Sequence, residues 1–574
     1  SLFVYVVLRA VLVPITYDEA ATFFHYIRVG QYWPGVAHWD ANNHILNSAL
    51  AYCSYKVLGP EQIWIRLPNV LSFLVYGFFA VRITAELKND LLRWLTLIAV
   101  LTAAFLLEFF SLARGYAMSI AFLLGAVYYA AQYLKTKRLK HQLSLWFWMV
   151  LAVTASLTLV NSYLILLGLS FLTLFRVESN RWQHVLVWVV FGLICFSAVS
   201  YYGFQLKERG LLYTGLADGF IGVTVQSLVR YQLQVESHLV SILITIIGAL
   251  SSLFLLFRLV LKRVGWSAIR LTAFLLLFNA VGSVLLNWIF GINFPENRVG
   301  MYYIPLFLIT FAGALDEMST ISKNIKFVGL SLLFFPVHLS SHLNLNTTIL
   351  WPKWHASDVI YNKVLEHQRL VGKTLTISAE YLNELGWAYY NFQNNAELQL
   401  LQRDPVPDTL SDLLIARSAD FDFSTVPYDT MFFDGTNGIY LLNQKEPIDW
   451  SAAKRMELKQ THIKGSDEFY EILNGSKNEL PATAGTFELR ATVNVKEGMW
   501  DGQLVIASYN TDGNDTYNMI PVHWIRPEWN GDELHVKRTY HFSDDATTYK
   551  VYFWNINKQE IELDIELVEF RSPQ

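Results

Sequence analysis

The run Leu2-Phe-Val-Tyr-Val-Val-Leu-Arg-Ala-Val-Leu-Val-Pro14 is followed directly by Thr16-Tyr17-Asp18-Glu19. The hydrophobic run predicts a membrane helix, so the two carboxylates of Asp18 and Glu19 are expected where that helix meets water. Ionisable groups at a membrane boundary are costly to desolvate, and an adjacent acidic pair there is a candidate functional site. The alternative is a pair that caps the next helix, since acidic residues favour a first helical turn.

The composition is that of a membrane protein. Of the 574 residues, 53% are hydrophobic, 15% are aromatic and 16% are charged, a combination that is rare in soluble proteins. The net charge of -4 offers no basic surface for nucleic acid. The two cysteines, Cys53 and Cys195, lie in apolar segments and indicate neither a disulfide framework nor a metal cluster.

Apolar runs of roughly 20 residues, long enough to cross a bilayer, recur through the first part of the chain. We expect about eleven membrane helices, near 2–16, 62–85, 91–108, 111–134, 144–159, 161–176, 184–204, 239–260, 267–290, 299–316 and 325–341. This predicts a polytopic α-helical membrane domain.

The charge of the loops predicts the orientation of these helices. Lys and Arg gather in alternate loops, at 88–93, 135–140, 176–181, 258–263 and 323–326. Cytoplasmic loops collect Lys and Arg, so these loops are expected inside. The other loops, and everything after 341, are then expected outside, together with Asp18 and Glu19.

The chain changes character after the last apolar run. Residues 355–480 mix amphipathic helical stretches with short β-rich runs, and from about 484 apolar and polar residues alternate between Gly, Asn and Asp turns. Period-two alternation of this kind predicts an antiparallel β-sandwich. We therefore expect three domains: a membrane domain over 1–341, a mixed α/β region over 342–482 and a jelly-roll-like sandwich over 483–574.

The expected outside segments concentrate ionisable residues. Asp40, His44 and Arg66 lie in the long first loop or at its end, and Arg114 and Arg298 lie at two further outside turns. An aromatic belt at the headgroups explains the aromatic content of that loop but not its charges. Arginine binds phosphate bidentately and stays charged; the alternative for either arginine alone is headgroup snorkelling.

The order of the motifs carries a family resemblance. They are Tyr17-Asp-Glu19, Asp40-x-Asn-Asn-His44-x-Leu46, Gly59-Pro-Glu61, Trp64-x-x-Arg-Leu-Pro68 and Ala113-Arg-Gly-Tyr116. In this order they resemble the polytopic GT-C glycosyltransferases, and most closely the branch of protein O-mannosyltransferases and lipid A aminoarabinose transferases. The resemblance covers about 10–310, so the C-terminal region lies outside it.

The resemblance implies transfer of a sugar from a polyprenyl-phosphate carrier to an acceptor on the non-cytoplasmic side, usually with inversion. It makes Asp18 the counterpart of the catalytic acid, with Glu19 as its neighbour. His44 corresponds to the His of a His-Pro-Leu-like motif, although Ile45 stands where the family often has Pro.

It also makes Arg114 and Arg298 candidates for binding the carrier phosphate, with Asp40 and Arg66 as further substrate-binding candidates. For Arg66 a structural role at the helix entry is an equal alternative.

The residue types fit this chemistry. A hydroxyl acceptor loses its proton as it attacks the anomeric carbon, and a carboxylate within hydrogen-bond reach can take that proton. A lipid phosphate leaving group needs cationic stabilisation. Asp18, Glu19, Asp40 and His44 include plausible metal ligands, but the resembling branch implies no metal, and we expect no cofactor.

The sequence thus predicts a glycosyltransferase that uses a lipid-linked hexose or pentose, with Asp18 as general base. The expected partners are the polyprenyl-linked donor, a glycan, lipid or protein acceptor and membrane lipids. The expected location is a bacterial inner membrane with the tail in the periplasm. The rivals are a transporter or lipid flippase, disfavoured because the acids lie at the boundary and no repeat is found, and a non-catalytic scaffold.

The tail is rich in aromatic residues that either bind sugar or pack in the core. They are Trp500, Tyr509, Tyr517, Trp524, Trp529 and Trp554. Aromatic faces stack on sugar rings, but sandwich cores also use Trp and Tyr, and core packing is the favoured interpretation for most of them.

Overall fold

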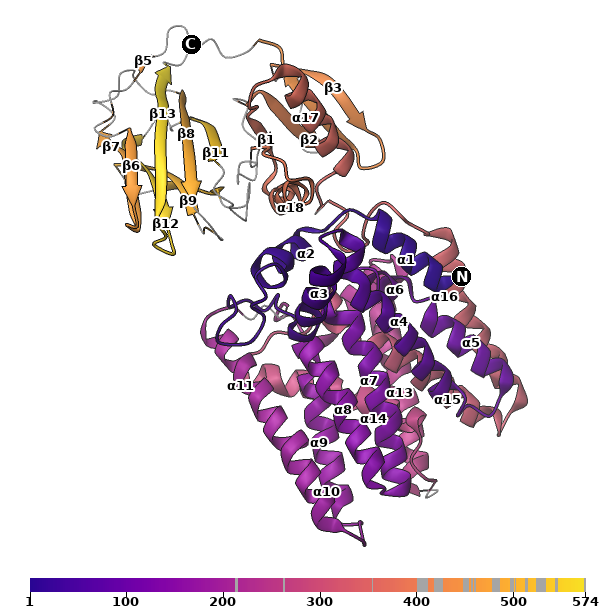
Figure 1. The fold of residues 1–574 in the computed structure, drawn as a ribbon. Coiled ribbons are helices and arrows are strands. Elements are labelled where there is room, and N and C mark those ends of the chain that lie inside the picture. The colour runs from indigo at the N-terminus through magenta and orange to yellow at the C-terminus, as the bar shows by residue number, and fades with distance from the viewer. Residues whose placement is uncertain are drawn as a thin grey trace. The chain divides into compact units, whose positions relative to one another are not determined.

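The computed structural model describes residues 1–211, 215–261, 264–353, 355–399, 411–417, 427–446, 454–455, 458, 461–476, 486–495, 500, 502–511, 515–522, 533–541 and 546–571. The chain forms two compact units. The helical unit comprises Ser1–Val13 and Ala21–Leu350, and the C-terminal unit comprises Pro14–Ala20 and Trp351–Gln574. Each is described by itself, with its elements labelled in Figure 1.

The helical unit consists of helices joined mostly by short turns. Its longer α-helices are α1 (Leu2–Leu12), α3 (Ile45–Leu58), α4 (Gln62–Thr84), α5 (Asp90–Leu101), α7 (Gly115–Thr136), α8 (Leu139–Ala155), α9 (Val160–Leu174), α11 (Cys195–Glu208), α13 (His238–Leu261), α14 (Ala268–Phe290) and α15 (Tyr303–Ser319). Its shorter ones are α6 (Ala104–Phe109), α10 (Arg181–Val187), α12 (Gln226–Leu233) and α16 (Phe334–Ser341), and α2 (Tyr17–Thr22) leads into the unit. Single π-helical or 3₁₀ segments are η1 (Phe23–Ile27), η2 (Leu157–Leu159), η3 (Trp188–Ile194), η4 (Ile221–Val225), η5 (Asn297–Gly300) and η6 (Lys323–Leu333).

Within the part of the chain that the structure describes, six helical stretches are long and apolar enough to cross a membrane. They are Gln62–Thr84, Gly115–Thr136, Leu157–Leu174, Arg181–Glu208, His238–Leu261 and Ala268–Phe290. Each coincides with an expected apolar run, which confirms the helical membrane region. Two other expected runs are interrupted, since 91–108 divides into α5 and α6, and 325–341 divides into η6 and α16. The total of about eleven spans stays a prediction.

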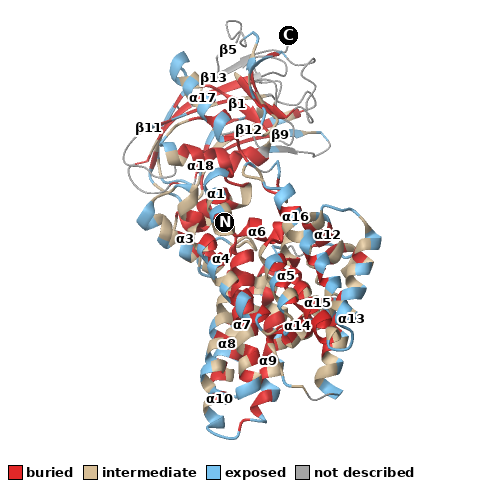
Figure 2. Ribbon diagram, turned by 90° about the vertical axis from the view of Figure 1, so that its right-hand side faces the viewer, coloured by how far each residue is buried: buried red, intermediate tan, exposed pale blue. Residues whose placement is uncertain are grey.

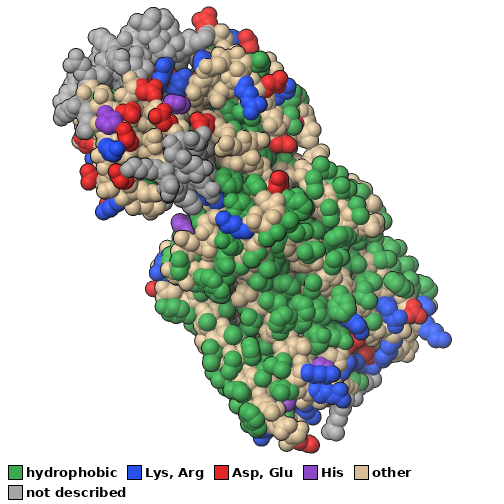
Figure 3. Space-filling view, viewed as in Figure 1, with side chains coloured by type: hydrophobic (Ala, Val, Ile, Leu, Met, Phe, Trp, Pro, Cys, Tyr) green, Lys and Arg blue, Asp and Glu red, His purple; other side chains and the backbone are tan. Residues whose placement is uncertain are grey.

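The surface of the helical unit is apolar where a soluble protein would be polar. On α13, Leu250 is 62% exposed and Phe257 is 59% exposed, whereas Ser241 and Ser252 are fully buried. This is the reverse of an amphipathic helix in water. Figure 3 shows hydrophobic side chains covering much of the visible face, with Lys and Arg side chains gathered towards its lower end. The chain is therefore an integral membrane protein.

Helix α7 forms the centre of the helical unit. It packs against α4, α8 and α14, and most of its residues are buried, from Gly115 to Tyr133 (Figure 2). Close packing here depends on a small residue, because a Cβ on Gly125 would lie 2.9 Å from ring atoms of Phe79 and Trp148. The N-terminal end of α7 carries the motif residues Arg114 and Tyr116.

The first part of the C-terminal unit is a small mixed sheet with two helices. The elements are α17 (Asp358–Val371), β1 (Ile377–Ala379), the 3₁₀ turn η7 (Tyr381–Asn383), α18 (Glu384–Asn394), β2 (Leu413–Arg417), β3 (Tyr428–Asp434) and β4 (Ile439–Gln444). The strand order is β1-β2-β4-β3, with β1 parallel to β2 and the other pairs antiparallel. Early chain also enters this unit, because Thr16 forms an isolated antiparallel bridge with His355.

The remaining strands form two antiparallel sheets. They are β5 (Lys454–Arg455), β6 (His462–Gly465), β7 (Phe469–Ser476), β8 (Thr486–Val495), β9 (Gly502–Asn510), β10 (Asp515–Pro521), β11 (Glu533–His541), β12 (Ala546–Asn555) and β13 (Ile561–Arg571). One sheet has the order β10-β9-β12-β7, and the other has the order β11-β8-β13-β5, with β6 also paired to β13.

One face of each sheet is buried. Leu504, Ile506 and Phe553 are fully buried in the first sheet, as are Leu489 and Leu563 in the second. The expected strand-rich, antiparallel tail is confirmed. Strands β5, β6 and β7 precede the expected domain boundary at 482/483 and pair into these same sheets.

Candidate functional site

Three segments of the helical unit bring predicted site residues together around the ring of Tyr116. His44 precedes α3, Arg114 and Tyr116 lie at the start of α7, and Arg298 lies in η5 just before α15. The His44 ring lies edge-on to the Tyr116 ring, with centroids 4.5 Å apart. We call His44, Arg114, Tyr116 and Arg298 the Tyr116 cluster.

The two arginines of the cluster lie beside the same ring. The guanidinium carbon of Arg114 is 5.7 Å from the Tyr116 ring centroid, and that of Arg298 is 6.0 Å from it. Arg298 Nε donates to the Tyr116 hydroxyl at 3.3 Å, and Arg114 Nη1 donates to Thr22 Oγ1 at 3.1 Å. Because arginine keeps its charge at any working pH, the cluster is a permanent cationic centre suited to an anionic group.

His44 supplies a neutral acceptor next to these cations. Its Nδ1 lies 2.8 Å from the carbonyl oxygen of Ala155, and a carbonyl only accepts, so Nδ1 carries the proton and Nε2 is the acceptor. Within the described residues Nε2 has no hydrogen-bond partner. Burial, and then the charge of Arg114, hold the pKa of His44 well below its usual range. His44 is therefore neutral at physiological pH.

Gly115 allows this arrangement. A Cβ on Gly115 would lie 2.0 Å from the Ala155 carbonyl oxygen and 2.9 Å from His44 Cβ. The glycine of the Ala-Arg-Gly-Tyr motif is thus required for the close approach of the His44 segment and the end of α8 to α7. Asn47 also fixes this turn, because its Nδ2 donates to the Ala113 carbonyl at 3.0 Å.

An apolar cavity lies beside the segment that carries Arg298. Its volume is about 160 Å³, and its walls come mainly from η4 and α12 to α15, including Phe220, Leu228, Gly248, Leu276, Tyr303 and Phe307. The backbone N–H of Asn297 donates to Ser227 Oγ at 2.8 Å, which joins η5 to α12. The chain then runs from Arg298 directly into Tyr303 on the cavity wall. A cavity with this lining accommodates hydrocarbon.

The two residues of the acidic pair, Asp18 and Glu19, differ in burial and in hydrogen bonding. Glu19 is fully buried, and its Oε2 accepts from Thr16 N and Thr16 Oγ1, each at 3.1 Å, while Glu19 N donates to Thr16 Oγ1 at 3.3 Å. This reciprocal pattern is a capping box at the start of α2. Asp18 is half-buried. Residues 14–20, and so both acids, group with the C-terminal unit.

Asp18 and Thr22 are four residues apart on α2. Side chains at this spacing lie on the same face of a helix. Thr22 belongs to the helical unit, where its hydroxyl accepts from Arg114. Thr22 was not singled out by the sequence motifs.

The structure places Asp40 in a local turn of the first loop. Its Oδ1 accepts from Asn42 N at 2.8 Å. Burial first, and then the charge of Asp40, raise the pKa of the Tyr26 hydroxyl above its usual range, so Tyr26 remains a hydrogen-bond donor. The sequence analysis gave Tyr26 no role.

The first loop is also held by an aromatic contact with the end of α11. The Arg209 guanidinium lies 4.0 Å from the ring centroid of Trp39, and the ring of Tyr202 lies 5.7 Å from that of Trp39. Residues 205–238 contained only a generic cluster of charged and aromatic residues, so their sequence did not identify Arg209 as the partner of Trp39.

Arg66 takes a structural position. It is fully buried, and its Nη1 donates to the carbonyl oxygens of Ala10 at 3.1 Å and Val13 at 2.7 Å. These contacts hold the end of α1 and match the alternative of a role at the helix entry. Its predicted part in substrate binding stays a prediction.

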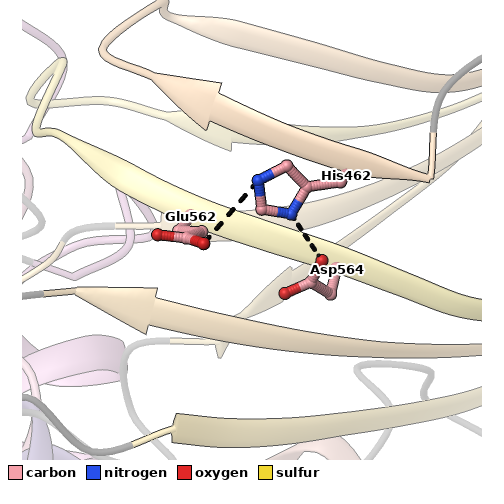
Figure 4. A group of neighbouring side chains, drawn as sticks. All are labelled: His462, Glu562 and Asp564. Carbon is pink, nitrogen blue, oxygen red and sulfur yellow. Dashed lines mark hydrogen bonds and ion pairs between the residues drawn. The ribbon is translucent and has the colours of Figure 1, made fainter.

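Among the described residues of the C-terminal unit, one group has the composition of a metal site. His462 on β6 and Glu562 and Asp564 on β13 place three ligand atoms within 4.8 Å of one another (Figure 4). His462 Nδ1 lies 2.6 Å from Asp564 Oδ1, and Lys464 forms an ion pair with Glu562 at 3.1 Å. The lysine already neutralises one carboxylate, so this group is best described as a ladder of ion pairs across exposed strands.

Comparisons with known proteins give distant structural likenesses. No family model and no curated protein matches the sequence. The crystal structure of ArnT from Cupriavidus metallidurans bound to undecaprenyl phosphate is 13% identical, with a TM-score of 0.43 over 77% of this chain and 96% of that chain. ArnT in the apo state is 11% identical, with a TM-score of 0.42 over 76% and 95%.

The archaeal oligosaccharyltransferase AglB from Archaeoglobus fulgidus, in complex with an inhibitory peptide and a dolichol-phosphate, is also similar. It is 8% identical, with a TM-score of 0.36 over 97% of this chain and 96% of that chain. The chain is thus similar in its course to membrane proteins of known structure, and at TM-scores this low nothing about its activity follows from the likeness.

Proposed function

We propose that this protein is a membrane glycosyltransferase that moves a hexose or pentose from a polyprenyl-phosphate carrier to an acceptor on the non-cytoplasmic face. The observation that carries the proposal is the Tyr116 cluster. Two arginines and a neutral histidine surround one ring, and the Arg298 segment continues into the wall of an apolar cavity. A phosphate joined to a hydrocarbon chain needs both features.

In the proposed reaction, Arg114 and Arg298 bind the carrier phosphate. As the bond from the anomeric carbon to the phosphate oxygen breaks, negative charge grows on that oxygen, and preorganised cations stabilise it. His44 Nε2, as an acceptor beside them, receives a hydrogen bond from a hydroxyl of the substrate. The isoprenoid chain enters the apolar cavity.

Asp18 is the proposed general base. The acceptor hydroxyl gives its proton to the Asp18 carboxylate as its oxygen attacks the anomeric carbon from the face opposite the leaving phosphate, which inverts that centre. Glu19 supports this role by fixing the start of α2. We propose that no metal takes part, because arginine already supplies the positive charge that the leaving group requires.

The test is consumption of labelled donor by purified protein in lipid nanodiscs. The probes are ¹⁴C-labelled polyprenyl-phosphate hexoses and pentoses, with an envelope extract as the source of acceptor and with EDTA present or absent. We expect the parent to transfer label in both conditions. Asp18→Asn should lose about 10²- to 10⁴-fold in rate, the usual contribution of a general base.

Matched controls separate the roles. Asp90, an acid whose side chain is 80% exposed at the start of α5, serves as the control, and Asp90→Asn should transfer at the parent rate. Arg298→Gln should weaken binding of polyprenyl phosphate, whereas Arg138→Gln, in the exposed turn between α7 and α8, should not. A folded Asp18→Asn protein with parental rate would refute the base. A parent that consumes none of the probes would refute the transferase and favour a transporter.

A further inference from the structure

The outer face of the sheet β10-β9-β12-β7 carries a row of aromatic side chains, of which Phe469 and Tyr517 are exposed and Tyr552 and Trp554 are half-buried. Directly paired residues of a sheet point to the same side. Tyr517 pairs with Ala507, Tyr552 pairs with Glu471, and Trp554 pairs with both Gln503 and Phe469. The other face of these strands is the buried one.

The rings on this face contact one another without being buried. Phe469 is 54% exposed and Tyr517 is 51% exposed. The rings of Phe469 and Trp554 stack at 6.0 Å between centroids with planes 20° apart, and Phe469 meets Tyr552 edge-on at 5.7 Å. The hydroxyls of Tyr517 and Tyr552 lie 3.1 Å apart. We call Phe469, Tyr517, Tyr552 and Trp554 the aromatic row.

A β-bulge brings Phe469 into the row. The pairing of β12 with β7 shifts between Val551 and Tyr552. Val551 pairs with Leu473, but the next residue, Tyr552, pairs with Glu471, so one residue of β7 is skipped. Under strict alternation from Asn474, Tyr470 would point outward and Phe469 inward. The bulge reverses this and leaves Tyr470 buried and Phe469 exposed. Bulges that re-aim a side chain occur both at sheet edges and next to binding sites, and β7 is an edge strand of this sheet.

Polar groups are interleaved with these rings. Lys550 Nζ lies 5.5 Å from the Tyr552 centroid and 3.6 Å from Glu471 Oε2, and the half-buried Gln503 stands beside Trp554 in register. An exposed aromatic patch rimmed by hydrogen-bonding groups matches a ligand that is apolar on its ring faces and hydroxylated at its edges.

We infer that the aromatic row is a carbohydrate-binding site, on which sugar rings stack while the exposed Glu471 and Lys550 side chains bind hydroxyls. The contrast with Trp500 supports this assignment. Trp500 is 1% exposed and donates its indole N–H to Asn555, as a core tryptophan does. The inference of sugar binding is argued from this face of the sheet alone. That the bound sugar is a glycan acceptor rests on the proposed function.

The test measures binding of defined oligosaccharides to the full chain in lipid nanodiscs free of sugar-based detergent. The probes are hexasaccharides of glucose (α1-4 and β1-4 linked), mannose, xylose and N-acetylglucosamine, titrated against tryptophan fluorescence and by calorimetry. We expect millimolar or tighter binding of at least one. Phe469→Ala and Tyr517→Ala should each weaken it by about tenfold or more, as loss of a central aromatic contact does.

Phe433→Ala is the matched control. Phe433 is an exposed aromatic residue on β3 and is 46% exposed, and its loss should leave binding unchanged. Phe469→Tyr keeps the ring and should retain binding. Thermal unfolding of each variant verifies the fold.

Three results would overturn the inference. They are no binding of any probe, binding that survives the double substitution F469A/Y517A, and a Phe469-dependent self-association or vesicle binding in place of sugar binding. If oligosaccharides bind but no donor is consumed, the proposed function fails and the sugar site stands. If donor is consumed but no oligosaccharide binds, the sugar site fails and the proposed function stands.

Discussion

His44 shows how one backbone carbonyl determines the chemistry of a side chain. Because the Ala155 carbonyl occupies Nδ1, the proton must stay there and the lone pair must face the Tyr116 cluster on Nε2. Burial, and then the charge of Arg114, lower the pKa of His44 and keep the ring neutral. A histidine held in this way accepts a hydrogen bond and resists protonation.

Stability should therefore depend on pH through His44. Its folded pKa is lowered, while in the unfolded chain it titrates near about 6.5. The contribution of neutral His44 to the free energy of unfolding is thus complete above about pH 6.5. It is lost as the pH falls from there towards the folded pKa, because in this range the unfolded chain binds a proton at His44 and the folded chain does not. His44→Asn keeps a donor at the position of Nδ1 for the Ala155 carbonyl and removes the titration. Melting temperature should fall more steeply below neutral pH in the parent than in His44→Asn, and parallel curves would contradict the assignment.

Gly115→Ala should destabilise the helical unit. The added methyl would lie 2.0 Å from a backbone oxygen that cannot move away cheaply, and overpacking of this kind costs about 1–3 kcal/mol. Thermal unfolding in nanodiscs measures the effect. Gly168→Ala on α9 is the control, since a Cβ there meets nothing within 4 Å. Equal melting temperatures for the two variants would refute the close-packing argument.

At this scale the ordered motifs named His44 and Arg114, and the position of Arg298 at an outside turn named the third residue. The structure places all three around Tyr116, and their roles stay predictions. The same motifs could not divide the roles of Asp18 and Glu19. The Thr-x-x-Glu spacing of Thr16 and Glu19 was a capping-box signature that was visible in the sequence, and it applies to Glu19 alone.

Helix α2 is the element that presents Asp18. It has only six residues, Tyr17–Thr22, and short helices are marginal by themselves. The capping box of Thr16 and Glu19 is therefore a large part of what defines its first turn, and the position of Asp18 depends on it.

Substitution of Glu19 tests this dependence. Glu19→Ala removes the reciprocal bonds and should cost about 0.5–2 kcal/mol in stability, with a matching loss of transfer. Glu19→Gln retains the capping pattern and should retain both. Loss of transfer in a stable Glu19→Gln protein would show instead that the charge of Glu19 acts in catalysis.

Apolarity alone could not reveal where a run breaks. The run 91–108 looks continuous in composition, but α5 ends at Leu101 and α6 starts at Ala104. The break places Glu108 where its Oε2 accepts from Arg9 Nη2 at 3.0 Å and from Ile349 N at 2.8 Å. Such a long-range ion pair leaves no periodic signal in the sequence.

For the whole molecule, the expected orientation can be tested with the few cysteines of the chain. In a Cys53→Ser, Cys195→Ser background, a single new cysteine at Trp33, which is 65% exposed in the first loop, should react with a membrane-impermeant maleimide on intact cells. One at Arg138, between α7 and α8, should react only after lysis. The opposite pattern would place the Tyr116 cluster on the cytoplasmic face and refute the proposed direction of transfer.

The broad architecture followed from composition because lipid and water impose different residue patterns on a chain. Helices such as α13 and alternating strands such as β12 each carry their own period. The pairing of Thr16 with His355 could not be predicted, because a single bridge between distant residues has no period at all.

The bridge between Thr16 and His355 means that one of the first segments to be synthesised pairs with one that is synthesised much later. Residues 14–20 leave the ribosome among the first, yet the partner of Thr16 lies at position 355, after the last helix of the helical unit. The segment that carries Asp18 therefore waits for its folded neighbours until the helical unit has been made. A chain interrupted during membrane insertion would therefore hold lipid-facing helices while the segment that carries Asp18 still lacked its bridge to His355.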